Sequence, residues 1–197
     1  MKFHLFRVLI LANTHAALFS PAFAQDATRS SGSATNQLKL PGPEAKNLML
    51  GTWAIKTEYA PSKEMPNGGT GEGIEVWRLG PGGYSVIEEY REKTLKGEIA
   101  GFVTFWWDED LKGQRFLWCD NANPQGCEVS KKVAKWEGNR LVYSEDRQEN
   151  GKTITHREVF EDITAVSFLQ ILEEGPVGGA LKRTITIHAS KILESSL

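Results

Sequence analysis

Histidine and cysteine are scarce in this chain of 197 residues, which holds four histidines and two cysteines. Two of the histidines lie in an N-terminal stretch that we expect to be removed, which leaves His156 and His188. That count excludes a histidine-rich metal site. Zinc knuckles use two pairs of ligands, and no second pair accompanies Cys119 and Cys127. We therefore expect no metal.

The short motifs of several large enzyme classes are also missing. The chain has no Gly-x-Ser-x-Gly nucleophile elbow, no phosphate-binding loop and no dinucleotide fingerprint. Its acidic turns at 108–110 and 173–174 do not have the ligand spacing of a calcium loop. No catalytic residue is predicted from a motif.

Positive charge is not in excess either. The 23 Lys and Arg residues against 25 Asp and Glu residues give a formal net charge of −2, which becomes −4 if Lys2 and Arg7 are lost with residues 1–24. The basic residues are spread among glutamates and form no patch. A mildly acidic chain of this kind is a poor binder of polyanions, so we exclude nucleic acid as a partner.

No apolar run reaches the roughly 20 residues that a transmembrane helix needs. The run from 8 to 19 is interrupted by the polar residues 13–15, follows two basic residues and precedes an Ala-x-Ala motif that ends at Ala24. This order is typical of a secretory signal peptide. We expect residues 1–24 to be removed, and the mature protein to be periplasmic or extracellular without stable membrane insertion.

The rest of the chain divides by composition. Residues 25–45 are rich in Ser, Ala, Thr, Gly and Pro and poor in large apolar side chains, which predicts a flexible linker. Residues 46–191 are enough for one domain with one core, and 192–197 are a short tail. No pattern indicates an oligomeric state.

The two cysteines flank seven residues that are typical of a loop. In an exported protein this spacing predicts a disulfide between Cys119 and Cys127 at the base of a hairpin. Free thiols or a metal pair are the alternatives, and the interval is longer than metal knuckles favour.

Glycine-rich and asparagine-glycine turns separate short runs in which apolar and polar residues alternate. The runs are 52–59, 71–79, 84–91, 98–107, 114–119, 127–136, 140–147, 152–160, 165–172 and 180–189. The edge strands of such a meander would expose unpaired backbone groups unless the sheet closes on itself. We therefore predict an all-β, antiparallel up-and-down barrel of about ten strands. A β-sandwich is the alternative, but nearly every link here is short. Residues 43–50 predict a short N-terminal helix.

The order Gly51-Thr52-Trp53, after a short helix and before successive hairpins, resembles the opening of lipocalins and their calycin relatives. The resemblance implies that Trp53 packs across the closed end of the barrel near an arginine of a late strand, for which Arg183 is the matching position. Lipocalins have eight barrel strands and a late helix, and this chain has no such helical pattern. We expect any functional cavity at the end away from Trp53, near the loop of residues 60–70.

The domain as a whole resembles an uncharacterised group of bacterial lipocalin-like proteins known as a domain of unknown function. The resemblance rests on Leu50-Gly51-Thr52-Trp53, Gly80-Pro81-Gly82-Gly83-Tyr84, Trp106-Trp107-Asp108, Trp136-Glu137-Gly138-Asn139 and Asn150-Gly151-Lys152. It implies an apolar cavity and supplies no catalytic residues.

Strand alternation also indicates which side chains could face a ligand. A buried Glu88 beside Tyr90 would be costly unless paired, which makes it a functional candidate. His156 and Glu158 share a face, unless Val159 packs inside in their place. The candidate ligand-binding residues are Trp107, Trp118, Tyr90, Glu88, Tyr143, His156 and Glu158.

These patterns predict an exported barrel that binds a small hydrophobic molecule, with roughly 25 cal/mol gained for each Å² of apolar surface buried. One alternative is an isomerase- or hydrolase-like enzyme that uses His156, Glu158 or Glu88 as acid or base. Another is an envelope interaction protein whose barrel is filled by its own side chains. We expect no cofactor. Haem bound through His188 is the alternative, although the parity of its strand points His188 outward.

Overall fold

Antiparallel strands make up most of the described chain, which in this computed structural model comprises residues 48–63, 65–122 and 126–193. All of them belong to one unit, Leu38–Leu197. The predicted signal peptide, the linker and residues 194–197 of the tail lie outside the described residues. So does most of the predicted N-terminal helix, of which Leu48, Met49 and Leu50 are described. Leu48 and Met49 form part of a 3₁₀ turn, and Leu50 is not helical.

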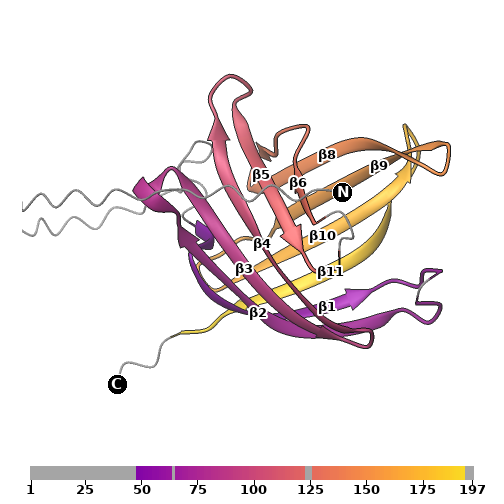
Figure 1. Cartoon of the computed structure of the whole chain (residues 1–197), viewed down its shortest axis with the longest axis horizontal. Helices are drawn as coiled ribbons and strands as arrows, with labels where there is room; N and C mark the ends of the chain where they lie inside the picture. Colours follow the sequence, from indigo (N-terminus) through magenta and orange to yellow (C-terminus); the bar gives the residue numbers. More distant parts are fainter. Residues whose placement is uncertain (1–47, 64, 123–125, 194–197) are drawn as a thin grey trace, which may run out of the picture. The chain divides into compact units, whose positions relative to one another are not determined.

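Eleven strands form one antiparallel sheet in the order β6-β5-β4-β3-β2-β1-β11-β10-β9-β8-β7. They are β1 (Gly51–Tyr59), β2 (Gly69–Leu79), β3 (Ser85–Thr94), β4 (Gly97–Asp108), β5 (Gly113–Asp120), β6 (Cys127–Val129), β7 (Lys135–Glu137), β8 (Arg140–Glu149), β9 (Lys152–Glu161), β10 (Ser167–Pro176) and β11 (Lys182–Lys191). A one-turn 3₁₀ helix, η2 (Pro81–Gly83), joins β2 to β3. The sheet curls so that β1 pairs with β11, as Figure 1 shows. This confirms the predicted all-β, up-and-down barrel.

The predicted strand 127–136 is wrong as a single strand and is divided into β6 and β7. After β6 the backbone N–H of Ser130 donates to the carbonyl of Phe116 at 2.8 Å. Ala134 then pairs with Gln114, with N–O distances of 2.8 and 2.7 Å. The chain thus bends across β5 between two separate contacts. The alternation of side chains continues through the bend, so the sequence period does not reveal it.

An aromatic core fills one end of the barrel. Trp53 is fully buried, its indole N–H donates to the carbonyl of Met49 at 2.8 Å, and its ring meets Phe168 edge-on at 4.8 Å. Trp77 stacks on Phe105 with ring centroids 5.4 Å apart. The aromatic core at this end therefore forms around Trp53, which is the position that the resemblance to lipocalins implied for this residue.

The predicted pairing of Trp53 with Arg183 is wrong. The cation above the Trp53 ring is Lys191, whose Nζ lies 5.2 Å from the ring centroid and donates to the carbonyl of Leu50 at 2.7 Å. The register of β1 and β11 places Trp53 opposite Lys191. Arg183 is exposed and lies eight residues earlier on β11, or about 26 Å along the strand at about 3.3 Å per residue.

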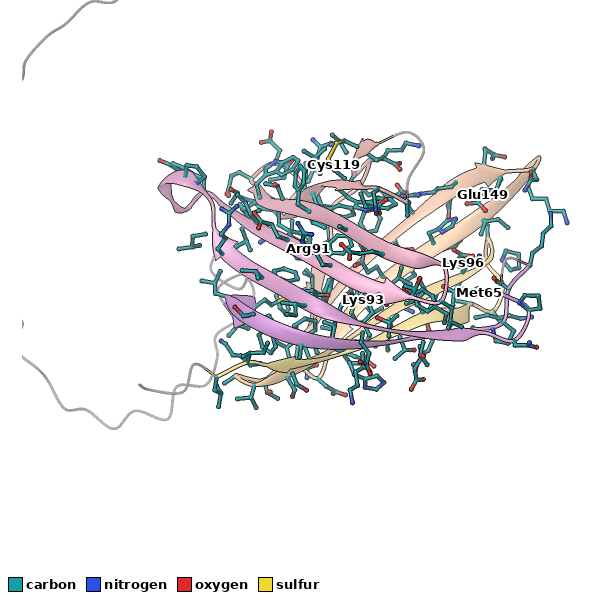
Figure 2. All side chains as sticks on the ribbon, turned by 60° about the horizontal axis from the view of Figure 1, so that its bottom comes forward. Met65, Arg91, Lys93, Lys96, Cys119 and Glu149 are labelled. Atoms are coloured by element: carbon teal, nitrogen blue, oxygen red, sulfur yellow. A yellow bond between two sulfur atoms is a disulfide. The ribbon has the colours of Figure 1, made fainter. Side chains whose placement is uncertain are left out.

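The predicted disulfide is confirmed. Cys119 on β5 and Cys127 on β6 are directly opposite in the ladder, with Cα atoms 4.1 Å apart, and their sulfur atoms are bonded. Figure 2 shows the bridge beside the label of Cys119. It holds the three-residue strand β6 against the edge of the sheet.

Candidate functional site: the cavity inside the barrel

A cavity of about 440 Å³ lies inside the barrel, beyond the aromatic core, at the end away from Trp53. Its walls come from β1, β2, β3, β4, β5, β8, β9, β10 and β11, which are most of the strands of the sheet. The apolar part of the wall consists of Ile55, Ile99, Val103, Phe105, Phe116, Trp118, Leu172, Ile185 and Ile187.

The polar part of the wall is dominated by carboxyl groups. Seven of them line the cavity, namely Glu75, Glu88, Glu92, Asp120, Glu158, Glu173 and Glu174. The basic groups on the same wall are Arg147, Arg157 and His156. The excess of acidic groups inside a largely apolar cavity is the main electrostatic feature of the site.

Three carboxyl groups form a layer directly above the aromatic core. The register of β2 and β3 pairs Trp77 with Glu88, and Glu75 with Tyr90, so Glu75 and Glu88 are diagonal neighbours on the inward face. Glu158 approaches from β9 on the other side, two residues before the buried Phe160. We call Glu75, Glu88 and Glu158 the carboxyl layer.

Burial changes the acidity of the carboxyl layer. Loss of water raises the pKa of Glu75 to about 7, although the Trp77 indole donates to its Oε2 at 3.0 Å. Burial, and then the nearby carboxyl groups of Glu75 and Glu158, raise the pKa of Glu88 well above its usual range. Burial also raises the pKa of Glu158, against the hydrogen bond that Gln170 donates to it at 2.6 Å. These groups therefore hold protons at a pH where an exposed glutamate is ionised.

Glu88 differs from the other two members of the layer. It is only 5 % exposed, yet no hydrogen bond or ion pair joins its carboxyl group to another described residue. Glu75 has Trp77 as a partner, and Glu158 has Gln170. An unpaired buried carboxyl group is costly, and its side chain faces the cavity.

A second polar group lies higher in the cavity. The Tyr90 hydroxyl donates to Oδ2 of Asp120 at 3.0 Å, and the Trp118 indole donates to the same oxygen at 2.7 Å. Gly101, on β4 opposite Tyr90, makes this possible, because a β-carbon there would stand 2.7 Å from the Tyr90 hydroxyl. Asp120 thus holds both aromatic side chains in place, so the rings of Tyr90 and Trp118 form a fixed part of the cavity wall.

Tyr59 and Glu92 form a third group near the end of β1. The Tyr59 hydroxyl donates to Oε2 of Glu92 at 2.9 Å. The Glu92 side chain lies over Gly71, where a β-carbon would collide with it. Burial, followed by the charge of Glu92, raises the pKa of Tyr59. The hydroxyl therefore stays protonated and remains a donor.

The basic groups of the cavity wall are paired with carboxylates away from the carboxyl layer. Arg147 contacts Glu145 and reaches Glu128 of β6 at 3.7 Å. His156 lies between Glu149, at 2.6 Å from its Nε2, and Glu174, at 3.2 Å from its Nδ1. These contacts lie on β8, β9 and β10, toward the turns that connect the strands.

Six of the seven predicted ligand-binding residues line this cavity, namely Trp118, Tyr90, Glu88, Tyr143, His156 and Glu158. Trp107 does not. It pairs with Gln114 at the end of β4, and its indole donates to Glu109 at 2.7 Å in the following turn. His156 and Glu158 both face inward, so the alternative with Val159 inside is wrong. His188 is exposed on the outer face.

Several lining residues were absent from the sequence-based set, among them Glu75, Glu92 and Arg147. Glu75 lies two residues before Trp77 on an alternating strand, so the parity of β2 already placed it inward. Glu92 follows Glu88 and Tyr90 by the same rule. The role of Arg147 could not be predicted from parity alone. Its partner Glu128 is on β6, which is far from β8 in the order of paired strands.

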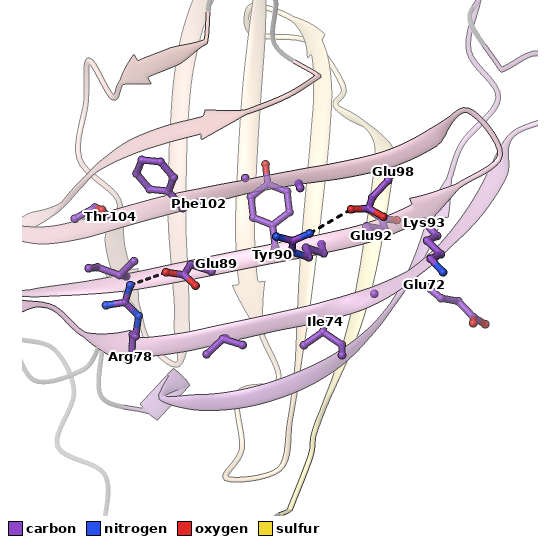
Figure 3. A pocket seen from close by; sticks show the side chains of 16 residues that line it. Glu72, Ile74, Arg78, Glu89, Tyr90, Glu92, Lys93, Glu98, Phe102 and Thr104 are labelled. Carbon is purple, nitrogen blue, oxygen red and sulfur yellow. Dashed lines mark hydrogen bonds and ion pairs between the residues drawn. The ribbon is translucent and has the colours of Figure 1, made fainter.

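The barrel also has a larger hollow on its outer face, about 890 Å³, over β2, β3 and β4. Figure 3 shows that ion pairs border it, Arg78 with Glu89 at 2.5 Å and Arg91 with Glu98 at 3.5 Å. The side chains of these pairs are about half exposed or more, and exposed ion pairs of this kind contribute little energy. We place the candidate site in the interior, where polar groups are buried and convergent.

Two further features bear on the class of site. Within residues 48–63, 65–122 and 126–193, no group of three or more His, Cys, Asp or Glu side chains is arranged to hold a metal ion. In the same part of the chain, no helix has the length and apolar character needed to cross a membrane.

No protein-family model and no curated protein matches the chain. Among solved structures, it is similar to a de novo designed fluorescence-activating β-barrel, at 9% identity and a TM-score of 0.41, over 76% of this chain and 98% of that one. It is also similar to a redesigned β-barrel, mFAP1, bound to DFHBI, at 11% identity and a TM-score of 0.40, over 75% of this chain and 99% of that one. The fold and the site described above rest on the geometry of the chain itself.

Proposed function

We propose that this protein binds a small, largely apolar molecule inside its barrel. The observation that carries the proposal is the cavity of about 440 Å³, whose wall combines a continuous apolar surface with a few convergent polar groups. Cavities that hold small ligands have volumes of about 300 to 1,000 Å³ and this kind of lining. An exported carrier or sensor of such a molecule is the function that this arrangement supports best.

The fixed aromatic wall favours binding over a filled structural barrel. Trp118 and Tyr90 are held by Asp120, so they line the cavity without closing it. A ligand that buries apolar surface against such preorganised side chains loses little additional side-chain entropy. Each Å² of apolar surface that it buries contributes roughly 25 cal/mol.

The arrangement gives less support to the enzymatic alternative. A general base needs a proton acceptor that is free to reach the substrate and held by a suitable partner. His156 contacts Glu149 and Glu174 through its two ring nitrogens, and no hydrogen bond joins it to Glu158 among the described residues. His156 therefore has no free ring nitrogen for an acid or base role, and we propose binding as the function.

Two neighbouring residues of β4 provide a matched test. Val103 lines the cavity, whereas Phe102 faces outward and is 40 % exposed. We expect Val103→Trp to fill the cavity and Phe102→Trp to leave it open. The probes are 2-naphthylmethanol, 2-naphthylmethylamine and 2-naphthoate, and their dissociation constants are measured by calorimetry.

We expect the wild type to bind at least one of the three probes, Phe102→Trp to bind it equally well, and Val103→Trp to bind it at least ten times more weakly. The proposal fails if the wild type binds none of them. It also fails if Val103→Trp, shown to be folded by near-ultraviolet circular dichroism, binds as tightly as the wild type.

A further inference from the structure

We propose that the ligand carries a cationic nitrogen, and that this nitrogen is held at the base of the cavity by Glu88 together with Glu75 and Glu158. The inference rests on the proposed function and names the chemical class of the ligand. It describes an amphiphilic amine with its cation against the carboxyl layer and its apolar body along the wall above.

The first support is the position of Glu88. Its carboxyl group is buried, faces the cavity and has no hydrogen-bond or ion-pair partner among the described residues. Glu75 and Glu88 lie on the adjacent strands β2 and β3, Glu158 lies on β9, and all three side chains line the same cavity. Burying several carboxyl groups together costs free energy unless a hydrogen-bond or charge partner is present.

The second support is that the basic groups on the cavity wall are paired with other carboxylates. Arg157 contacts Glu173 at 3.6 Å, and Arg147 is held between Glu145 and Glu128. His156 is held by two further carboxylates, as described above. Arg147 also attracts the carboxyl group of Glu158, but no basic group of the chain acts in this way on Glu75 or Glu88 among the described residues, so a positive charge from outside the chain would be their matching partner.

The third support is the contrast with other ligand classes. A neutral molecule could accept one hydrogen bond from a protonated Glu88, but it would leave the mutual repulsion of the layer unchanged once any member ionises. An anion would be repelled by every member of the layer that is ionised, in a site of low polarity where that repulsion is strong. A cation is the class whose binding is favoured by all three members.

The apolar body of the ligand has a wall to follow. Val103 and Ile187 lie on opposite sides of the cavity, on β4 and β11, and Trp118 forms part of the wall from β5. A flat or compact hydrocarbon body attached to the nitrogen would bury its surface against them. The size of the cavity sets the limit at a small molecule.

The three naphthyl probes test this inference because they share one apolar body and differ in charge. At pH 8 we expect the wild type to bind 2-naphthylmethylamine at least ten times more tightly than 2-naphthylmethanol, and not to bind 2-naphthoate measurably. Glu88→Gln keeps the shape of the side chain and removes its charge. It should weaken amine binding at least tenfold and change alcohol binding by less than twofold.

Glu89 provides the control, because it is the next residue of β3, faces outward and pairs with Arg78. Glu89→Gln should bind all three probes like the wild type. If Glu88→Gln does not fold, Glu158→Gln and the selectivity of the wild type itself decide the question.

The outcomes separate the two proposals. If the wild type binds the alcohol as tightly as the amine, or prefers 2-naphthoate, the cationic ligand is excluded while the binding function stands. The same conclusion follows if folded Glu88→Gln and Glu158→Gln both retain full amine affinity. If no probe binds, the binding function fails first and the inference falls with it.

Discussion

Lys191 Cε lies 2.5 Å from the point that a β-carbon on Gly51 would occupy. Gly51 is the first residue of β1 and Lys191 is the last residue of β11. The two fit together because glycine has no side chain. Gly51 also has a φ of 132°, a backbone conformation that favours glycine. The ammonium group of Lys191 uses this space to reach the carbonyl of Leu50 and the face of Trp53.

Replacing Gly51 with alanine should therefore destabilise the closed end of the barrel. We expect Gly51→Ala to lower the free energy of unfolding by about 2 to 4 kcal/mol, from backbone strain and displacement of Lys191 together. Urea denaturation followed by tryptophan fluorescence measures the change. Gly83→Ala is the control, since Gly83 has a φ of 71° but nothing within 4 Å of its β-carbon position. An equal loss in the two variants would contradict the role of Lys191.

The buried Glu75 should make stability depend on pH. Its pKa is raised to about 7 in the folded protein from about 4.5, so the folded state retains the proton longer. The free energy of unfolding should then fall as pH rises from about 4.5 to about 7, by up to about 3 kcal/mol from this group. Below and above that window its contribution is constant.

Glu75→Gln should reduce this decline, since glutamine does not titrate. Urea denaturation at a series of pH values gives the free energy of unfolding of both proteins. The quantity to compare is the slope of that free energy against pH. Glu72→Gln, on the exposed face of β2, should leave the slope unchanged. Parallel profiles for the wild type and Glu75→Gln would show that Glu75 keeps an ordinary pKa.

Binding of an amine to the carboxyl layer should release protons. Glu75 on β2, with a pKa of about 7, holds its proton at pH 6, and burial raises the pKa of Glu88 on β3 and of Glu158 on β9 as well. Arg147 on β8 is the nearby cation that acts on Glu158. Affinity for 2-naphthylmethylamine should therefore rise between pH 5 and 7, by at most about tenfold per pH unit for each proton released.

Calorimetry at pH 6 in phosphate and in imidazole buffer counts the protons released. The heat of amine binding should differ between the two buffers, whereas the heat of 2-naphthylmethanol binding should not. A binding heat for the amine that is the same in both buffers would mean that the carboxyl layer does not change its protonation.

The disulfide should stabilise the edge of the sheet. Cys119 and Cys127 are separated by 8 positions, and closing a loop of that length removes about 2.5 kcal/mol of chain entropy from the unfolded state. We expect the double Cys→Ser variant to lose about that much stability, measured by urea denaturation. Alkylation without a reducing agent should leave both cysteines of the wild type unlabelled, and labelling of both would contradict the bond.

Strand parity was sufficient to predict the fold and most of the cavity wall. Glu88, Tyr90 and Glu158 were candidates for the inward face because a barrel strand alternates its side chains between two faces. The same rule places Glu75 on the inward face, because it lies two residues before the buried Trp77 on β2.

Other features depend on how distant strands are aligned, which parity does not specify. Arg183 and Lys191 lie on the same strand, and only the register of β1 with β11 decides which of them is next to Trp53. Trp107 has inward parity but lies at the end of β4, beyond the cavity. The bend at residues 130–134 is set by contacts with β5, and its own sequence alternates as a strand would.

That bend has a consequence for how a molecule could enter. Near Gln114 the backbone of Ala134 joins the two edges of the sheet, but among the described residues no ladder joins β8 to β5 or β6 farther along. There the edges are linked by the side chains of Arg147 and Glu128. Where only side chains join them, the two edges can separate without the loss of a backbone ladder. High salt weakens the pair of Arg147 with Glu128 and should ease that separation, which the ring contact between Phe116 and Tyr143 still opposes.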